Sequence, residues 1–541
     1  MKLNRVAVVG GGPGGLYAAR LLKLRWPDCQ VVVHEQSVPS ATFGFGVGLA
    51  GRTQRRLEAA DPDSLRDMVA AGYRYGSEMR NRTGAALVRA VHDGAQIGIA
   101  RSRLLDILQR HAEKAGVEIV VGQRADAWSL DADLVIAADG VNSSARTARA
   151  QDFGAEVAIG DGYYLWAGTD FALPTAMFAP AETEHGTFVT HAYPYQPDRS
   201  TFLIETDADT LRRAGLGAIR HEPARDASDT VSLAYLEEAF AGVLEGHRLI
   251  GNRTQWLRFR TVRCARWHVD GTVLLGDAAH TAHYSIGSGT KIAMEGAIAL
   301  VDALQRSEDL PTALTAYESE RRPKVERLQD LAERSRLWWE SFPQRLETPV
   351  ERVTVAYMSR AGNVPLARFA QTNPEVVRRA LADYAGRTVR DRLPDDPDRW
   401  VLTQPLQRDD LSFASRVVEH ESLLADARFA ELHHGSAPAW SAAGDRLLEQ
   451  ATSLHRDGIT GFLLSGPPDR PAVLNRLDLA ERIRLATGSL VAVHAPERLS
   501  ADLAAGLVSS RIDLACWDIA VAAAAEPPPE PRPAAASAEL G

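Results

Sequence analysis

The N-terminal segment contains the feature that most constrains the fold, a valine-rich run that ends in glycines. The segment RVAVVGGGPGGLYAARLLKLRWPDCQVVVHEQ, residues 5–36, has the pattern of a buried strand, a glycine turn, a helix and a second strand. Gly10, Gly12 and Gly15 form G-x-G-x-x-G, where the first glycine permits a tight turn, the second lets backbone approach a pyrophosphate and the third allows close helix packing. The pattern predicts a βαβ unit that binds a dinucleotide.

An acidic residue closes this unit. Glu35 ends the second predicted strand, where its carboxylate can accept hydrogen bonds from ribose hydroxyls. A strand, a helix and a terminal acid in this order favour a binding site over an ordinary glycine-rich turn. The candidate cofactor-binding residues here are Gly10, Gly12, Gly14, Gly15 and Glu35. These residues alone do not distinguish NAD from FAD as the bound dinucleotide.

Two later segments repeat the pattern of a buried strand that ends in small and polar residues. DADLVIAADGVNSSAR, residues 131–146, ends its strand at Asp139-Gly140, and LLGDAAHTAHYSIGSGTKIAMEGAIAL, residues 274–300, bends at Gly276-Asp277 before an alanine-rich helix. Asp277 could simply cap a helix, but an acid between a glycine and a run of small residues is poorly explained by capping alone. Arg101 begins a third helix and could, taken alone, be a solvated helix-start arginine.

Composition limits the classes of partner. The chain has 541 residues, is 45% hydrophobic and 24% charged, and carries a net charge of −9, so it has no overall positive field for nucleic acid or an anionic membrane. No apolar run reaches the roughly 18 residues of a membrane span, and the N-terminus lacks a signal-peptide pattern. The three cysteines lie far apart, and His280 and His283 have no third ligand at metal spacing. We expect a soluble cytoplasmic protein with no metal, no nucleic-acid partner and no membrane partner.

The three segments together resemble the class A flavoprotein monooxygenases, which share the para-hydroxybenzoate hydroxylase-like fold. G-x-G-x-x-G, ADGVNSSAR and GDAAH occur in the order and at the spacing of that family, and YESERRPKV, residues 317–325, resembles the helix that follows its flavin domain. The loop HTAHYSIGSGTK, residues 280–291, resembles a narrower branch, the salicyloyl-CoA 5-hydroxylase and 2-aminobenzoyl-CoA monooxygenase group. Most members have a proline near Ser285, so the geometry of this loop should differ here.

The resemblance implies an α/β fold, a Rossmann-like FAD-binding domain with an inserted antiparallel-sheet substrate domain. It implies one non-covalent FAD, with Glu35 on the adenosine ribose, Arg101 near the pyrophosphate and Asp277 on the ribityl or pyrophosphate end. Asp139 and Gly140 would serve FAD and transient nicotinamide binding. Gly287 and Gly289 would open a helix whose amide end faces the flavin ring. NADH or NADPH and O2 are the implied co-substrates.

Candidate substrate and catalytic residues follow from the middle of the chain and from the loop. Alternating strands there would wall an aromatic pocket, with His185, His191 and Tyr193 as candidates, although alternating side chains are more often core and surface. Arg258 and Arg260 could hold a CoA or nicotinamide phosphate, since arginine binds phosphate in bidentate geometry, or could be solvated charge. His280 and Tyr284 are the candidates for deprotonating a phenol.

The expected domain boundaries follow the changes in pattern. The FAD-binding domain is expected at 1–160 and 250–345, the substrate-pocket sheet at 161–249 and a helical linker at 346–398. Residues 399–520 should form a small α/β domain that resembles a truncated old-yellow-enzyme barrel, because this length cannot close a (β/α)8 barrel of about 250 residues. A Pro/Ala-rich tail, 521–541, has too little apolar bulk to fold.

The resemblance makes an FAD-dependent aromatic hydroxylase the first hypothesis. It would use NAD(P)H and O2 through a flavin C4a-hydroperoxide, and its substrate would be an aryl-CoA thioester such as salicyloyl-CoA, hydroxylated to gentisyl-CoA, or a carrier-bound aryl group. A second hypothesis is a tailoring hydroxylase of a free indole or phenolic natural product. A third is a flavin-binding structural partner without turnover. A homodimer is a candidate assembly.

Overall fold

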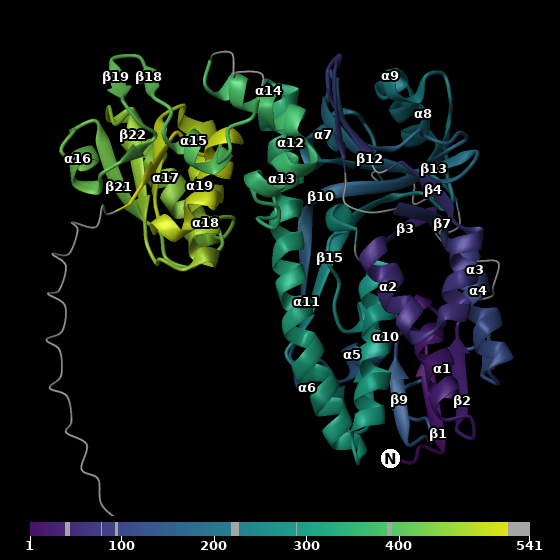
Figure 1. Cartoon of the computed structure of the whole chain (residues 1–541). Coiled ribbons are helices and arrows are strands. Elements are labelled where there is room, and N and C mark those ends of the chain that lie inside the picture. The colour runs from purple at the N-terminus through teal and green to yellow at the C-terminus, as the bar shows by residue number, and fades with distance from the viewer. Residues whose placement is uncertain are drawn as a thin grey trace, which may run out of the picture. The chain divides into compact units, whose positions relative to one another are not determined.

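The computed structural model describes residues 1–37, 44–76, 78–91, 96–217, 227–287, 289–386 and 392–517 (Figure 1). The predicted tail at 521–541 and Ser288 of the loop lie outside the described residues. Contacts within the chain divide it into unit 1, Met1–Asp395, and unit 2, Asp396–Gly541. Most of the predicted linker, 346–398, therefore belongs to unit 1.

Unit 1 contains the predicted Rossmann-like sheet. In spatial order its strands are β16 (His268–Val269), β17 (Thr272–Leu274), β9 (Leu134–Ala137), β1 (Arg5–Val9), β2 (Gln30–Glu35) and β8 (Glu118–Val121). β1 pairs in parallel with both β2 and β9, and Val6 and Val8 are fully buried. A run of valines suits such a strand, because a parallel sheet is covered on both faces. The predicted βαβ unit is confirmed.

Helices cover this sheet and extend from it. The helices of this part are α1 (Pro13–Arg25), α2 (Gly51–Ala60), α3 (Pro62–Ala71), α4 (Arg101–Lys114), α5 (Ser144–Ala148), α6 (Ala150–Phe153), α10 (Gly289–Arg306) and α11 (Leu310–Glu340). α1 packs against α4 and α10, and α10 packs against α11 (Figure 1). The glycine turn therefore lies between the ends of three strands and the start of α10.

A second, mainly antiparallel sheet is larger than the predicted segment 161–249. In spatial order it contains β14 (Leu249–Ile250), β10 (Ala155–Thr169), β13 (Arg199–Thr206), β12 (Gly186–Gln196), β11 (Ala176–Thr183), β5 (Glu78–Thr83) and β6 (Ala86–Val91), and β15 (Trp256–Cys264) pairs with β10. β5, β6 and β15 come from outside that segment, because the chain returns to the sheet edge before and after it. The helices α7 (Ala208–Arg213), α8 (Thr230–Ala239) and α9 (Ala241–Leu244) belong to its connections.

A small three-stranded sheet packs against β12 of the second sheet. Its strands are β3 (Gly46–Ala50), β7 (Gln96–Ala100) and β4 (Tyr73–Tyr75). A Cβ atom on Gly46 would lie 2.3 Å from Tyr195, and one on Gly98 would lie 2.3 Å from the Pro194 carbonyl oxygen. Glycine at both positions lets this sheet approach β12 closely, and β7 runs directly into α4 and Arg101.

Residues predicted as a linker instead pack on the second sheet. They form α12 (Val350–Ser359), α13 (Leu366–Thr372) and α14 (Pro374–Tyr384). Tyr357 of α12 belongs to a buried cluster with Phe178 and Trp339. Asn373 accepts a hydrogen bond from the Val91 amide at 2.5 Å and donates one to the Val91 carbonyl at 3.0 Å, which pairs the backbone at the end of β6. These helices are part of the core of unit 1.

Unit 2 is the predicted small α/β domain. Its five-stranded parallel sheet has the order β20 (Val417–Val418), β24 (Leu514–Cys516), β23 (Leu490–His494), β22 (Gly461–Ser465) and β21 (Phe429–His433). Its helices are α15 (Pro397–Leu402), α16 (His420–Leu424), α17 (Ala442–Arg456), α18 (Arg470–Thr487) and α19 (Ser500–Val508). A hairpin of β18 (Leu406–Arg408) and β19 (Leu411–Phe413) contributes to the apolar cluster on one face of the sheet.

Candidate functional site

The glycine turn has the geometry that its pattern predicts. Gly10 has a φ of +107°, and a Cβ atom there would lie 2.3 Å from the Ala138 carbonyl oxygen. A Cβ on Gly15 would lie 2.1 Å from the Gly10 carbonyl oxygen, whereas one on Gly12 would meet nothing within 4 Å. Gly10 and Gly15 therefore permit close packing, and Gly12 leaves open space in front of the turn. A Cβ on Gly14 would lie 3.3 Å from Ala293 of α10, so this glycine serves helix packing.

Glu35 lies beside this turn. Its carboxylate accepts hydrogen bonds from the backbone amides of Gly11 and Ser37, each at 2.7 Å. The two bonds hold the carboxylate at the end of β2, in front of the glycine turn, where a ribose could reach it.

Asp277 lies in the short 3-10 turn Gly276–Ala278, and Arg101 is the first residue of α4. Asp277 is exposed to solvent in this turn, yet burial by the surrounding protein raises its pKa, and the positive charge of Arg101 opposes the shift. Burial also lowers the pKa of Arg101, and Asp277 opposes that shift. Arg101 and Asp277 are thus two opposite charges that act on one another where the surrounding protein desolvates them.

The segment that follows the Asp139-Gly140 turn is tied to the 3-10 turn that contains Asp277. One Asp139 carboxylate oxygen accepts bonds from the amides of Ser144 at 2.8 Å and Ala145 at 3.2 Å, so it caps α5. Gly140 has a φ of +81°. Arg146 donates to the Ala278 carbonyl at 2.9 Å. Arg146 therefore connects the two motifs that the sequence placed far apart.

The loop before α10 contributes the remaining predicted glycines. Gly287 has a φ of +62°, which favours glycine, and it ends the 3-10 turn Tyr284–Ile286. α10 begins at Gly289, so its free amides lie at the end of this loop. Lys291 lies in the first turn of α10. Burial is the main cause that lowers its pKa, and nearby arginines also lower it.

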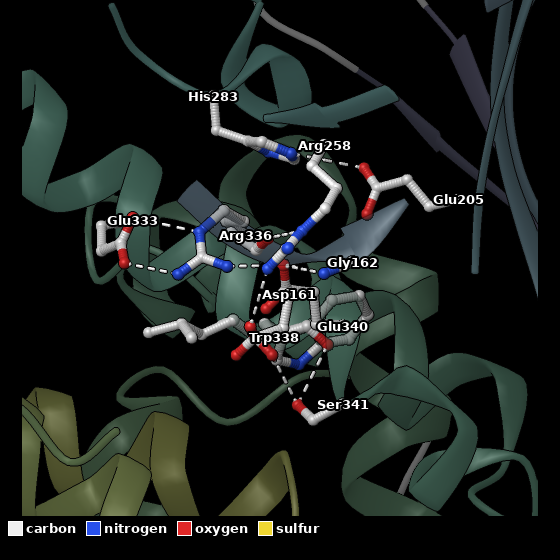
Figure 2. Close-up of polar contacts among 12 residues, drawn as sticks. Asp161, Gly162, Glu205, Arg258, His283, Glu333, Arg336, Trp338, Glu340 and Ser341 are labelled. Atoms are coloured by element: carbon white, nitrogen blue, oxygen red, sulfur yellow. Dashed lines mark hydrogen bonds and ion pairs between the residues drawn. The ribbon is translucent and has the colours of Figure 1, made fainter. Parts of the chain in front are cut away.

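A buried cluster of aromatic and titratable side chains surrounds Tyr284. Its ring lies 4.1 Å from the His283 ring, 5.1 Å from Tyr164 and 5.9 Å from Phe259. The His283 Nε2 atom lies 3.5 Å from a Glu205 carboxylate oxygen (Figure 2). Burial raises the pKa of Tyr164 to about 12, with the charge of Asp277 as the next cause, so the Tyr284 cluster lies near Asp277.

Glu205 is the residue that sequence reasoning missed. It lies on β13, is 5% exposed, and is the one acid in the strand RSTFLIET. Burial raises its pKa to about 8. An acid inside a buried strand is costly unless it is paired or functional, and that was the available signal.

His280, predicted as catalytic with Tyr284, lies in a different environment. It is 1% exposed, its ring lies 4.9 Å from the Trp267 ring, and neither ring nitrogen has a hydrogen-bond partner among the described residues. Burial, with the charge of Arg321 second, lowers its pKa to about 3. His280 is therefore neutral at physiological pH and packs in the core, while His283 lies beside Tyr284.

The structure brings two of the three predicted pocket residues together. His191 and Tyr193 point to the same face of β12, and their neighbours on β13 in register, Leu203 and Thr201, share that face with Glu205. The Tyr193 hydroxyl donates to the Gly46 carbonyl at 2.9 Å. His185 instead lies in the β11–β12 turn, where its Nδ1 is 2.9 Å from the Tyr235 hydroxyl of α8. Tyr235 packs against the opposite face of the sheet, so His185 is apart from the other two.

The two predicted phosphate-binding arginines lie near one another on β15. Arg258 donates to the Gly160 carbonyl at 2.8 Å and pairs with Asp161 at 3.2 Å (Figure 2). Arg260 donates to the Asn142 side-chain oxygen at 2.6 Å, beside the Asp139-Gly140 turn. Both arginines are exposed.

Comparisons with known proteins agree with this geometry. A family model described as "FAD binding domain" matches residues 86–332. Salicyloyl-CoA 5-hydroxylase of Streptomyces sp is 39% identical over 378 residues, 69% of this chain and 73% of that protein. The 3-hydroxy-4-methyl-anthranilyl-[aryl-carrier protein] 5-monooxygenase of Streptosporangium sibiricum is 38% identical over 363 residues, 66% of this chain and 95% of that protein. The chain belongs to the class A flavoprotein monooxygenases. It is an FAD-dependent monooxygenase.

A solved structure shares the fold of this monooxygenase. The tetrameric form of 2-methyl-3-hydroxypyridine-5-carboxylic acid oxygenase superposes with a TM-score of 0.53, at 22% identity, and covers 67% of this chain and 96% of that one. Among the described residues, no helix has a stretch long and apolar enough to cross a bilayer, and no group of three or more His, Cys, Asp or Glu side chains could hold a metal.

These residues fit an FAD molecule. Gly12 faces open space, Glu35 is held at the end of β2, and the opposite charges of Arg101 and Asp277 act on one another. Backbone amides at the glycine turn suit a pyrophosphate. Those at the start of α10 suit negative charge on a flavin ring.

Proposed function

We propose that this monooxygenase hydroxylates an aromatic ring that is carried as a thioester on CoA or on a carrier protein. The observation that carries the proposal is the pair of relatives above 35% identity. Their names, salicyloyl-CoA 5-hydroxylase and an aryl-carrier-protein 5-monooxygenase, both describe an aryl group held on a carrier. The match with the second relative includes 95% of that protein's length, so the likeness extends over nearly the whole of that enzyme.

The residues of the site divide into a part that holds the cofactor and a part that receives the ring. Glu35 would bind the adenosine ribose, and Arg101 and Asp277 the pyrophosphate and ribityl end. FAD, reduced by NADH or NADPH, supplies the activated oxygen when bound. The Tyr284 cluster excludes water and offers aromatic faces for an aryl ring to pack against.

The carrier would extend from this cluster toward the surface. Arg258 and Arg260 are exposed on β15 and are held by Asp161 and Asn142. Guanidinium groups bind phosphate in bidentate geometry, so these two arginines are our proposed contacts for CoA phosphates or for the nicotinamide cofactor's phosphate. Their existing partners would keep the guanidinium planes oriented before the phosphate arrives.

A substrate screen tests the proposal. The purified flavoprotein is mixed with NADH or NADPH, and oxidation is followed with salicyloyl-CoA, 2-aminobenzoyl-CoA, their free acids and no aromatic compound. We expect the thioesters to stimulate oxidation at least tenfold over the free acids, because the acids lack the carrier. Equal stimulation by the free acids would overturn the thioester assignment.

A second candidate is a tailoring hydroxylase of a free indole or phenolic compound. Protodeoxyviolaceinate monooxygenase of Chromobacterium violaceum is 28% identical over 377 residues, 67% of this chain and 95% of that protein, and its named substrate carries no CoA. Stimulation by free aromatics alone in the same screen would favour this candidate.

A further inference from the structure

We propose that Arg360 is a positioning residue of the active site. Through Ser335 and Ser285 it fixes the Nε2–H tautomer of His283, and this histidine in turn holds Glu205 as the acceptor of a proton from the hydroxyl or amino substituent of the aromatic ring. The part that concerns the ring rests on the proposed function. The part that concerns the tautomer does not, because it is a property of the enzyme without substrate.

The connection runs through five buried residues on four elements. Arg360 Nε donates to Ser335 Oγ at 2.7 Å, and Ser335 Oγ lies 2.7 Å from Ser285 Oγ. Ser285 Oγ lies 2.9 Å from His283 Nδ1, and His283 Nε2 lies 3.5 Å from Glu205. None of the five side chains is more than 8% exposed. Water has little access to compete with these contacts.

The direction of the hydrogen bonds follows from the arginine. A guanidinium can only donate, so Ser335 accepts from Arg360 and its own hydrogen is available to Ser285. The Ser285 hydroxyl can then donate to His283 Nδ1. The Ser285 backbone amide also points at Nδ1, at 3.4 Å, and an amide can only donate. Nδ1 is thus an acceptor, and the single proton of the neutral ring resides on Nε2, toward Glu205.

Arg360 has two further contacts that hold it in place. One terminal nitrogen donates to the Ser285 carbonyl at 2.6 Å, and the other donates to the Tyr357 carbonyl. Its guanidinium also lies 3.9 Å from the centre of the Tyr357 ring. Arg360 follows α12, in the segment predicted as a linker, and lies beyond the residues matched by the family model. The active-site loop is therefore held from outside the FAD-binding segment.

Charged groups on every side bear on Glu205. Arg336 and Arg360 favour its ionised form, and Glu340 and the buried Tyr284 hydroxyl lie near it. Arg336 is already paired with Glu340 at 2.5 Å and Glu333 at 2.6 Å (Figure 2). The Glu205 oxygen that faces His283 Nε2 at 3.5 Å makes no shorter hydrogen bond within the described part of the chain. The Nε2–H group of His283 and the Tyr284 hydroxyl are the two donors that face the Glu205 carboxylate.

The tautomer can be measured directly. In the substrate-free holoenzyme labelled with ¹⁵N-histidine, the His283 signals are identified by their loss in His283→Asn. We expect the Nε2–H tautomer in the wild type and a mixture of tautomers in Ser335→Ala. The matched control is Ser359→Ala, since Ser359 is a similarly buried serine whose hydroxyl donates to the Val355 carbonyl. An Nδ1–H tautomer in the wild type, or an unchanged signal in Ser335→Ala, would overturn the proposal.

The pH profile of product formation tests the role of Glu205. The rate of hydroxylation should rise with pH, and the rising limb of the pH profile should lie near pH 8, where Glu205 becomes a carboxylate. Glu205→Gln should remove this limb and lower product formation about 100-fold, while flavin reduction by NAD(P)H is retained. Ser335→Ala should move the limb upward by about half a pH unit or more, because Glu205 loses an oriented donor.

The outcomes separate the two proposals. If no aryl thioester is hydroxylated by the wild type, the proposed function fails and the labelled spectra still decide the tautomer. If hydroxylation proceeds and Glu205→Gln keeps both the limb and the rate, Glu205 is not the proton acceptor. A rate loss in Ser335→Ala without any shift of the limb would show a merely structural role for the relay.

Discussion

At the level of single residues, the glycine turn and Glu205 show two different kinds of constraint. The glycines are fixed by backbone contact, which spacing along the chain encodes, so the geometry of the glycine turn could be predicted position by position. The role of Glu205 depends on which strand lies beside the loop. The tertiary fold, not the local sequence, places β13 beside residues 283–285. The histidines illustrate the same limit, because the three-residue spacing of His280 and His283 says nothing about which one turns into the core.

The glycines give a contrast that can be measured. In Gly15→Ala the new Cβ would lie 2.1 Å from a carbonyl oxygen, so we expect a loss of roughly 2 kcal/mol or more in the free energy of unfolding. In Gly12→Ala the Cβ meets no protein atom within 4 Å, so the stability of the apoprotein should stay within about 0.5 kcal/mol. FAD affinity should nevertheless fall in Gly12→Ala, because the methyl group occupies the space in front of the turn.

Chemical unfolding and flavin retention on a desalting column check both variants. Equal stability of the two apoproteins, or full flavin retention by Gly12→Ala, would contradict this account of the turn.

Glu205 should also make stability depend on pH. Its pKa is about 8 in the folded protein and roughly 4.3 in an unfolded chain, so between these values the folded state binds a proton that the unfolded state does not. The free energy of unfolding therefore contains a contribution that is complete below about pH 4 and is lost as pH rises through 8. The Glu205→Gln variant lacks this contribution. Its free energy of unfolding should therefore rise relative to that of the wild type by roughly 1–3 kcal/mol between pH 5 and pH 8. Urea titrations of both proteins at pH 5 and pH 8 measure this change. A difference in unfolding free energy between variant and wild type that is the same at both pH values would contradict the prediction.

At the level of elements, the parallel sheet could be predicted closely and the second sheet only in part. The glycine motif and the valine-rich strand place β1, α1 and β2 in a known order. β5 and β6, by contrast, precede the central sheet by many residues and join it at an edge that no local pattern identifies. The helices at 350–384 looked like a linker because their apolar positions have no local partner. Their partner is the face of the second sheet that carries Phe178.

Truncation distinguishes a linker from a packed part of the core. A chain of residues 1–395 should fold and retain FAD, because it keeps α12, α13 and α14 on the second sheet. A chain of residues 1–345 exposes that apolar face and loses Asn373, which pairs the backbone of Val91. We expect it to aggregate or to lose FAD. Size-exclusion chromatography and the flavin spectrum report both outcomes, and a monodisperse, flavin-bound 1–345 chain would show that these helices are dispensable.

At the level of the whole molecule, the chain combines a flavin monooxygenase with a second α/β unit. In unit 2, β21, β22, β23 and β24 are neighbours in chain order and β20 lies beside β24, while β20 and β21 are the two edges of the sheet. The sheet is therefore open, whereas a barrel would also pair β20 with β21, and the likeness of residues 399–520 to a shortened barrel stays a proposal. The sequence allowed the class of unit 2 to be predicted, because length excluded a full barrel, whereas its strand order depends on long-range pairing.

We propose that this enzyme inserts one oxygen atom from O2 into the ring of an aryl thioester. The most direct measurement incubates the holoenzyme with NAD(P)H, salicyloyl-CoA and isotopically labelled O2, and analyses the thioester by mass spectrometry. We predict a hydroxylated thioester that carries one labelled oxygen on its ring, with no product from salicylate under the same conditions. A labelled product from salicylate alone, or NAD(P)H oxidation that leaves the thioester unlabelled, would contradict the account.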